Sequence, residues 1–549
     1  MPVADEEVPV LIVGGGPVGL TARALLERWG VRALLVEKRT ELSPFPRSRL
    51  VNVRSMEVFR QLGLAGTVAA NAFAPAYGRI RFRDTLRGED FATEAMVGVA
   101  APVPESPVTG VLTSQDRLEP TLLAAARAPV RFGTELVELT EEADGEGVVA
   151  VLVDRATDVR TRVRARYVLA ADGANSTVRQ HLAIGTAGPG RLGDFTTVVF
   201  DADLGHWGAL QPAGVYFTPL GSFGPVHPEG GWFWFGPTPE GAGDADWAAL
   251  VTRALGPDDG VRPEVLRVQH WAMNAFVADR FRNGRILLAG DAAHAIPPIG
   301  GLGMNTGVAD VHNLCWKLAG VLRGWAGPEL LATYATEREP VAHRTLRQAV
   351  ANAELLLGVL ARRRDQLRSD DAAAGRFELP WAERYFAQLG LVLGVTYRSA
   401  AVLTDGAAPE ASGAGSASAA GDGGTDGGTD YVPRAEPGHR MPHLWLAPGR
   451  STLDALGAWF TLFTPDPARW VPAADGAPWP LRIEALPAQW AGRAGLGPGG
   501  ALLVRPDGHI GARWPAYPPG DAPLHAALTA LTSRTAVTAG PAVRPPESP

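Results

Sequence analysis

The segment VPVLIVGGGPVGLTARALLERWGVRALLVE, residues 8–37, decides the fold. It begins with an apolar run of strand length, Val8–Val13, and passes through a glycine-rich turn into a helical stretch, Pro17–Trp29. A second apolar run, Val31–Val36, follows. A strand, tight turn, helix and parallel strand within about 30 residues are typical of dinucleotide-binding α/β proteins. The segment therefore predicts an α/β domain that binds a dinucleotide.

The glycines of this turn have the spacing G-x-G-x-x-G, and each has a physical task. Gly14 permits the tight turn, Gly16 lets a pyrophosphate approach the backbone, and Gly19 lets the helix pack on the strand. The free N–H groups at the start of the helix favour phosphates. Glu37, 18 residues after Gly19, is placed to accept hydrogen bonds from a ribose.

The same glycine spacing recurs at 188–193 and at 495–500. The first match leads into the β-like run Phe195–Phe200 and the second into Ala501–Val504, so neither opens a helix. Because the phosphate site needs a helix N-terminus, we expect both to be loops without a ligand.

Composition narrows the class of protein. The chain has 549 residues, 46% hydrophobic and 20% charged, which predicts a globular protein of several domains. A net charge of -7 without a Lys/Arg cluster argues against nucleic acid or an anionic membrane as a partner. The single cysteine, Cys315, excludes a disulfide scaffold and favours the cytoplasm. The acidic N-terminus and the lack of a long apolar run predict neither a signal peptide nor a membrane span.

Two further segments present acidic residues at strand ends. The stretch 167–179, YVLAADGANSTVR, delivers Asp172-Gly173 after an apolar strand, and the strand Arg285–Ala289 delivers Asp291. A Pro/Gly loop, Pro297–Gly303, then runs into a helix that we expect to begin near Asn305 or Thr306. The N-terminus of that helix carries a partial positive charge, which favours an anion in the loop.

In this order and spacing, the three segments resemble the group A flavoprotein monooxygenases, the p-hydroxybenzoate hydroxylase family, and most of all its aromatic polyketide hydroxylases. The resemblance covers nearly the whole chain. It implies an α/β fold with a Rossmann-like FAD-binding domain, an interleaved β-sheet substrate domain and a C-terminal thioredoxin-like domain. The implied boundaries are 1–76, 105–185 and 284–404 for the FAD domain, 77–104 and 186–283 for the substrate domain, 405–430 for a flexible linker, and 431–549 for the thioredoxin-like domain.

The resemblance also implies a set of cofactor-binding residues. In particular, Glu37 would bind the FAD ribose, Arg47 would lie at the pyrophosphate and Asp291 would hold ribityl hydroxyls. Leu302 and Ala170 depart from the residues that relatives often have, Gln and Gly. The full implied set is Val13, Gly14, Gly16, Pro17, Val18, Gly19, Glu37, Lys38, Arg47, Gln115, Val137, Asp172, Asp291, Pro298, Gly301, Gly303, Met304 and Asn305.

The implied reaction uses NADPH or NADH to reduce FAD, after which O2 forms a flavin 4a-hydroperoxide that hydroxylates an electron-rich ring. The implied substrate is a polycyclic aromatic polyketide of antibiotic biosynthesis. A β-like region rich in aromatic residues would cover it. In a strand, Trp232 and Trp234 face one side and Phe233 and Phe235 the other. We expect Tyr216, Trp232, Trp234 and Pro298 to contact substrate, while a core role for both faces is the alternative.

No residue is assigned as a catalytic base or a metal ligand. His294 suits a position packed beneath the Pro/Gly loop, and His312 suits helix packing. The C-terminal region has no cysteine, which excludes a thiol–disulfide role and leaves a structural one. Two other functions stay open: Baeyer–Villiger or quinone-rearranging oxygenation of a polyketide, and a non-catalytic binding protein with a flavin fold. The expected assembly is a monomer or homodimer.

Overall fold

The structure is a computed structural model that describes residues 4–204, 211–241, 246–256, 261–368, 389–404, 431–519 and 522–534. The linker predicted at 405–430 lies outside the described residues. Among the helices of the described ranges, none combines the length and the apolar character that crossing a bilayer requires.

The opening segment forms the centre of the first sheet. Strand β1 (Glu6–Val13) pairs in parallel with β2 (Ala33–Val36) on one side and β10 (Arg160–Ala170) on the other. Val10, Leu11 and Ile12 are fully buried, as expected for a parallel sheet covered on both faces. The remaining strands are β7 (Val130–Arg131) beyond β2, β17 (Ile286–Leu288) and β16 (Arg282–Asn283) beyond β10, and the hairpin β8 (Thr134–Glu141) and β9 (Val148–Asp154).

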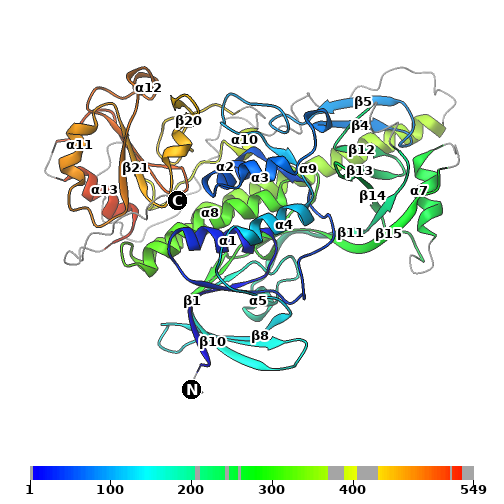
Figure 1. Cartoon of the computed structure of the whole chain (residues 1–549), viewed down its shortest axis with the longest axis horizontal. Helices are drawn as coiled ribbons and strands as arrows, with labels where there is room; N and C mark the ends of the chain where they lie inside the picture. Colours follow the sequence, from blue (N-terminus) through cyan, green and yellow to red (C-terminus); the bar gives the residue numbers. More distant parts are fainter. Residues whose placement is uncertain are drawn as a thin grey trace.

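Two helices that pack against each other lie against this sheet. Helix α1 (Pro17–Arg28) packs against α8 (Gly303–Leu322), and Figure 1 shows both lying above β1. The only cysteine, Cys315, lies in this contact, where its Sγ is 3.8 Å from the Ala22 carbonyl oxygen. Burial raises the pKa of the Cys315 thiol. Further helices are α2 (Val53–Gln61), α4 (Gln115–Ala124), α5 (Thr177–His181) and α9 (Ala332–Arg368).

The second sheet lies to one side of the first (Figure 1). Its long strands β11 and β15 pair along most of their length, and β11 carries register shifts at the glycines of 188–193. That glycine match therefore lies within an irregular strand rather than in the loop we expected, and it opens no helix. The strands in spatial order are β18 (His294–Ala295), β15 (Glu264–Ala278), β11 (Thr186–Asp201), β14 (Gly230–Pro237), β13 (Gly221–His227), β12 (Val215–Thr218), β4 (Arg79–Arg83) and β5 (Asp90–Ala95).

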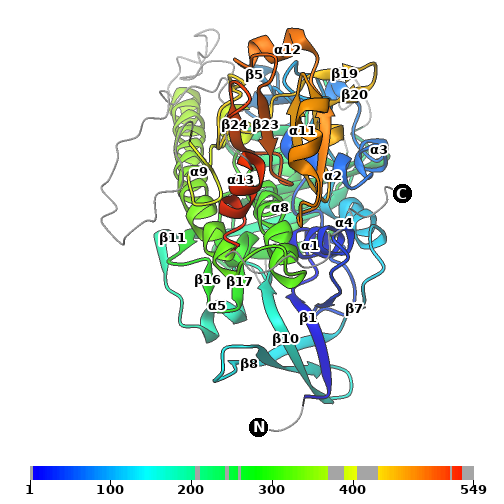
Figure 2. The ribbon, with the colours of Figure 1, turned by 90° about the vertical axis from the view of Figure 1, so that its left-hand side faces the viewer.

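The C-terminal region forms a third, separate sheet that packs beside α8 (Figures 1 and 2). Its central strand pairs in parallel with one neighbour and antiparallel with the other. The residues 495–500 connect a helix to a strand and open no helix, as expected. The strands in spatial order are β22 (Leu481–Ala485), β21 (Phe460–Thr464), β23 (Ala501–Val504) and β24 (Ile510–Trp514), and the helices are α11 (Pro467–Ala474), α12 (Ala488–Arg493) and α13 (Pro523–Leu531).

Candidate active site

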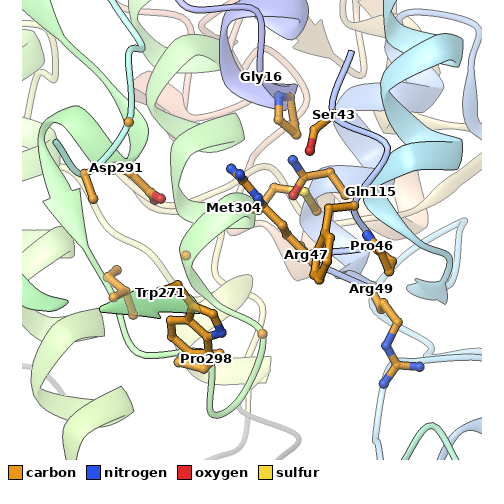
Figure 3. A pocket seen from close by; sticks show the side chains of 18 of the residues that line it. Gly16, Ser43, Pro46, Arg47, Arg49, Gln115, Trp271, Asp291, Pro298 and Met304 are labelled. Atoms are coloured by element: carbon orange, nitrogen blue, oxygen red, sulfur yellow. The ribbon is translucent and has the colours of Figure 1, made fainter. Parts of the chain in front are cut away.

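A cavity of about 780 Å³ lies where the carboxyl ends of the parallel strands meet the second sheet. This is the edge at which open α/β sheets bind their ligands, and the volume is in the upper part of the range for small-molecule sites. Figure 3 shows side chains from the loops and helices at these strand ends, together with Trp271 of β15, around the cavity. One end, here called the cofactor end, is lined by Gly15–Val18, Glu37–Arg39, Arg47, Gln115, Glu119, Asp172 and Asp291; the other, the aromatic end, is lined by Arg49, Val215, Phe217, Phe233, Phe235 and Trp271.

In the glycine turn, two glycines are needed for packing and a third leaves room for a ligand. Gly14 has a positive φ of 108°, and a Cβ on Gly19 would lie 2.0 Å from the Gly14 carbonyl oxygen. Gly16 lines the cavity, and a Cβ there would have no heavy atom within 4 Å. The turn is fixed by Glu37, whose Oε2 accepts a hydrogen bond from the Gly15 N–H at 2.7 Å.

Charges of both signs meet at the cofactor end. Arg47 extends into the cavity (Figure 3), and burial lowers the pKa of its guanidinium despite the carboxylates of Glu119, Asp291 and Glu37 nearby. Asp291 lies deep in the protein, yet its surface is exposed because it faces the cavity. Desolvation raises the pKa of Asp291, and His294 and Arg47 oppose that rise. The arrangement suits a ligand with both phosphates and hydroxyl groups.

Sequence reasoning missed Glu119, which lines the cofactor end beside Gln115. Its Oε1 accepts a hydrogen bond from Gln115 Nε2 at 2.7 Å, and its Oε2 accepts one from the Ser43 N–H at 3.3 Å. Burial raises the pKa of Glu119. The i,i+4 spacing of Gln115 and Glu119 on α4 was the available signal, since such residues share a helix face.

Asp172 lines the cavity and also holds the turn that follows β10. Its Oδ1 accepts a hydrogen bond from Ser176 Oγ at 2.6 Å, and its Oδ2 accepts one from the Val178 N–H at 3.1 Å. Desolvation raises the pKa of Asp172. Gly173, with φ of 85°, lets the chain turn beside it.

The Pro/Gly loop and the start of α8 border the cavity from the other side. Helix α8 begins at Gly303, two or three residues earlier than expected, so its first turn takes part in the cavity wall. Asn305 fixes the loop: its Nδ2 donates to the carbonyl oxygens of Leu50 and Gly301, at 2.9 and 2.7 Å. Four expected residues of this segment line the cavity, namely Pro298, Gly301, Gly303 and Met304.

A buried ion-pair network lies directly beneath this loop. Asp310 Oδ2 is 2.6 Å from His294 Nε2 and accepts a hydrogen bond from the Gly290 N–H at 3.1 Å. Its Oδ1 accepts a hydrogen bond from Arg338 Nε at 2.7 Å. His294 therefore packs beneath the loop and holds the segment that carries Asp291. His312, on α8, is also buried, and its Nε2 lies 2.9 Å from Gln61 Oε1.

The expected substrate residues of the second sheet require a correction. Tyr216, Trp232 and Trp234 do not line the large cavity within the described residues; they belong to a hydrophobic core on the opposite face of the sheet, beneath α7 (Trp247–Leu255). The alternating residues Phe217, Phe233 and Phe235 line the cavity instead. The physical reason is that side chains alternate along a strand, and α7 covers the face that carries the tryptophans. Trp271, on β15, also lines the cavity.

The other expected residues divide into two groups. Gly16, Pro17, Val18, Glu37, Lys38, Arg47, Gln115, Asp172 and Asp291 line the cavity. Val13, Gly14, Gly19, Val137 and Asn305 do not: Gly19 packs against Gly14, Gly14 also packs against Ala171, and Val13 ends β1. Val137 is half-buried on β8. Gly14, Gly19 and Asn305 therefore support the wall rather than form it.

The donor set of the cofactor end fits FAD. Gly16 leaves space beside the N-terminus of α1 for a pyrophosphate, and Arg47 supplies a cation there. Glu37 and Asp291 place carboxylates in the wall, which could accept hydrogen bonds from the hydroxyls of such a cofactor. The adjoining aromatic end leaves room for a planar substrate in the same cavity.

Comparison with known proteins agrees with this assignment. Residues 7–349 match the family model of the FAD binding domain, and residues 434–535 match that of the aromatic-ring hydroxylase C-terminal region. Aklavinone 12-hydroxylase RdmE of Streptomyces purpurascens is 36% identical, over 93% of this chain and 96% of its own.

Two solved structures share the whole fold. The flavin-dependent monooxygenase PieE, in complex with FAD and substrate, has a TM-score of 0.84 at 32% identity and covers 97% of this chain and 99% of its own. Aklavinone-11 hydroxylase, in a ternary complex with FAD and aklavinone, has a TM-score of 0.78 at 34% identity and covers 97% of this chain and 100% of its own.

The chain therefore belongs to the FAD-dependent aromatic-ring hydroxylases. It is a monooxygenase with FAD as its cofactor and O2 as its oxidant, and its α/β fold is that of the p-hydroxybenzoate hydroxylase family. The resemblance, fold class and enzyme class expected from the sequence are confirmed.

Proposed function

We propose that this enzyme hydroxylates a polycyclic aromatic polyketide in antibiotic biosynthesis, with NADPH or NADH as the reductant. The observation that carries the proposal is the single cavity in which a cofactor end adjoins an aromatic end. Phe217, Phe233 and Phe235 supply flat apolar surface for a fused-ring substrate. Relatives that act on aklavinone, by their names, support the same substrate class.

The cofactor-binding residues expected from the sequence are proposed to hold FAD. Gly16 and the α1 N-terminus would bind the pyrophosphate through backbone N–H groups, with Arg47 as the cation. Asp291 would accept hydrogen bonds from ribityl hydroxyls, and the backbone of Pro298–Gly303 would border the ring system. Bound FAD supplies the redox chemistry, taking electrons from the nicotinamide and activating O2.

The cavity wall assigns no general base to the substrate. Among the described residues, the carboxylates that line the cavity, Glu37, Glu41, Glu119, Asp172 and Asp291, come from the segments of the cofactor end. The histidine in the wall, His270, has its Nδ1 2.8 Å from Thr196 Oγ1, and its ring packs against Trp247 of α7, so we do not assign it as a base. The aromatic side chains exclude water and orient the ring. We propose that a phenol of the substrate is itself acidic enough to ionise, so that the reaction needs no protein base.

Turnover with defined substrates tests this function. Purified holoenzyme with NADPH would be supplied with a panel of polycyclic phenols and quinones, and NADPH oxidation and O2 consumption would be followed. We expect a product with one added oxygen and, by carbon-13 connectivity, an intact carbon skeleton bearing a new hydroxyl. An oxygen inserted beside a ketone would identify Baeyer–Villiger chemistry instead. A protein that cannot be loaded with FAD would contradict the enzymatic function.

The remaining expectations are also proposals. We propose the three-domain division with the boundaries given above, a cytoplasmic location, no nucleic-acid partner, and a monomer or homodimer. Light scattering of the purified holoenzyme measures its assembly directly.

A further inference from the structure

The aromatic end of the cavity contains a cation that has no carboxylate partner among the described residues. Arg49 precedes β3 (Leu50–Val51) and is one of the residues that line the cavity (Figure 3). Its Nη1 donates to the Pro225 carbonyl oxygen at 2.7 Å, and its Nη2 donates to the Gly214 carbonyl oxygen at 2.6 Å. Both acceptors are neutral, so the positive charge is not compensated.

The most deeply buried arginines among the described residues are paired with carboxylates, whereas Arg23, which is also buried, donates to three backbone carbonyl oxygens. Arg83, Arg338, Arg440 and Arg505 each form an ion pair with an aspartate or glutamate. Buried charges are normally paired in this way because desolvation is costly. Burial lowers the pKa of Arg49 to about 9, without a neighbouring charge as a further cause. The side chain is therefore still cationic at neutral pH.

The position of the guanidinium is fixed by packing. Its Cζ lies 4.3 Å from the centroid of the Phe233 ring, and Phe233 stacks on Phe235 with centroids 6.1 Å apart. Gly224 provides the space, because a Cβ there would lie 2.7 Å from Arg49 Nη2. A guanidinium has five N–H groups, and only two have acceptors in the described part of the chain. The cation is thus held beside the aromatic wall with donors to spare.

We propose that Arg49 is a specificity-determining residue that pairs with an anionic oxygen, an ionised phenol or a carboxylate, on the planar aromatic substrate. The inference rests on the proposed function and refines its substrate class. An opposite charge nearby favours the ionised form of an acid. Arg49 would therefore favour a phenolate, which is more electron-rich than the phenol and reacts more readily with an electrophilic oxygen. The phenol would lose its proton to solvent, and Arg49 would stabilise the phenolate that remains.

Binding to the oxidised holoenzyme, without reductant, tests the inference separately from turnover. The first pair of probes is anthraquinone-2-carboxylate and anthraquinone-2-carboxamide, which have the same ring system and differ in charge. Their dissociation constants are measured by perturbation of the flavin absorbance. We expect the wild type to prefer the carboxylate and Arg49→Gln to lose at least about tenfold of that preference, since a hydrogen bond to a charged group is worth roughly 1.5–3 kcal/mol.

A second probe, 1,2-dihydroxyanthraquinone, separates the phenol from the carboxylate, because its colour reports ionisation at a fixed pH. We expect a larger ionised fraction on the wild type than on Arg49→Gln if phenols are the natural anion. A response confined to the carboxylate pair would assign the site to carboxylates. Arg49→Lys should keep most of the charge preference.

The matched control is Arg267→Gln. Arg267 is an exposed arginine of β15 whose Nη1 donates to the Pro44 carbonyl oxygen at 2.5 Å, on the loop that precedes Arg49. It should leave the preference unchanged. Equal preferences in the wild type and Arg49→Gln, or no preference for either anion in the wild type, would overturn the inference. Absence of turnover with intact charge preference would contradict the proposed function alone.

Discussion

The glycines of the nucleotide turn have different roles: two are required for folding, and one leaves space for binding. Gly14 and Gly19 lie against each other, so their lack of a side chain is a packing requirement of the turn. Gly16 has open space where a Cβ would be, and its φ of -77° is accessible to other residues. The three positions of one fingerprint should therefore respond differently to the same substitution.

Alanine at Gly16 and Gly19 should separate FAD affinity from stability. Gly16→Ala should fold normally and bind FAD at least about tenfold more weakly. Its Cβ would occupy the space of the pyrophosphate and so displace the phosphate from the backbone N–H groups, whose hydrogen bonds to a charged group are worth roughly 1.5–3 kcal/mol. Gly19→Ala should destabilise the apoprotein by about 1–3 kcal/mol, because its Cβ collides with the backbone. Thermal unfolding of apoprotein and fluorescence titration with FAD measure the two effects. Equal FAD affinity in Gly16→Ala and the wild type would contradict this division.

Asp291 should contribute to FAD affinity but little to folding. Its side chain faces the cavity, and burial raises its pKa because no protein group compensates its charge fully. Asp291→Ala should weaken FAD binding about tenfold or more through the lost hydrogen bonds. Asp279→Ala, at an exposed aspartate outside the cavity wall, serves as the control. A titration that gives the same FAD affinity for both variants would place the ribityl chain elsewhere.

At the scale of the element, β14 carries two aromatic faces with different tasks. Trp234 lies in the core beneath α7, where its Nε1 donates to the Leu220 carbonyl oxygen at 3.0 Å. Phe235, the next residue, lines the cavity. One strand thus joins the hydrophobic core of the second sheet to the wall of the site.

Substitutions at these neighbouring residues should test the corrected assignment. Trp234→Ala should lower the free energy of unfolding by about 3–5 kcal/mol and leave substrate affinity of the remaining folded enzyme unchanged. Phe235→Ala should raise the substrate dissociation constant with a smaller loss of stability, since its side chain is only half-buried. Chemical denaturation and flavin absorbance titration provide both values. A loss of substrate affinity in Trp234→Ala but not in Phe235→Ala would show that the tryptophan face contacts the substrate.

The sequence predicts periodicity well and spatial neighbours poorly. The alternation of Trp232 to Phe235 was correctly predicted, but which face meets the cavity depends on where α7 packs, and that contact is long-range. Likewise, the turn at Gly14–Gly19 follows from local spacing. The link from Asn305 to Leu50 joins residues 255 positions apart, and no local pattern contains it. Arg49 was missed for the same reason: its environment comes from β13 and the segment before β12.

At the scale of the whole molecule, buried ion pairs join the C-terminal region to the rest. Arg440 pairs with Glu57 on α2, and Arg505 Nη1 lies 2.6 Å from Glu337 Oε1 on α9. Burial alone would raise the pKa of Glu57, but Arg440 and Arg54 lower it below the ordinary value. The C-terminal sheet is therefore bound to the helices that support the site.

These pairs predict how stability depends on pH. A carboxylate whose pKa is depressed by folding stabilises fully above its ordinary value, 4.5 for Glu57, and loses that contribution as the pH falls towards the depressed value. Glu57→Gln should cost about 3–5 kcal/mol at pH 7, since it leaves a buried arginine unpaired. The difference in melting temperature from the wild type should shrink below pH 4. Glu229→Gln, at an exposed pair with Arg117, should change little at either pH. A difference independent of pH would contradict the ion-pair explanation.

The buried position of Cys315 has a practical consequence. Thiol reagents act on the thiolate, and burial against α1 disfavours the thiolate of Cys315. The folded enzyme should therefore not react with maleimide dyes. A cysteine introduced at the half-buried Ser48, which lines the cavity, would then be the sole labelled position without any background substitution. Fluorescence from a dye at that position would report ligand entry in real time, including ligands that the flavin spectrum does not detect.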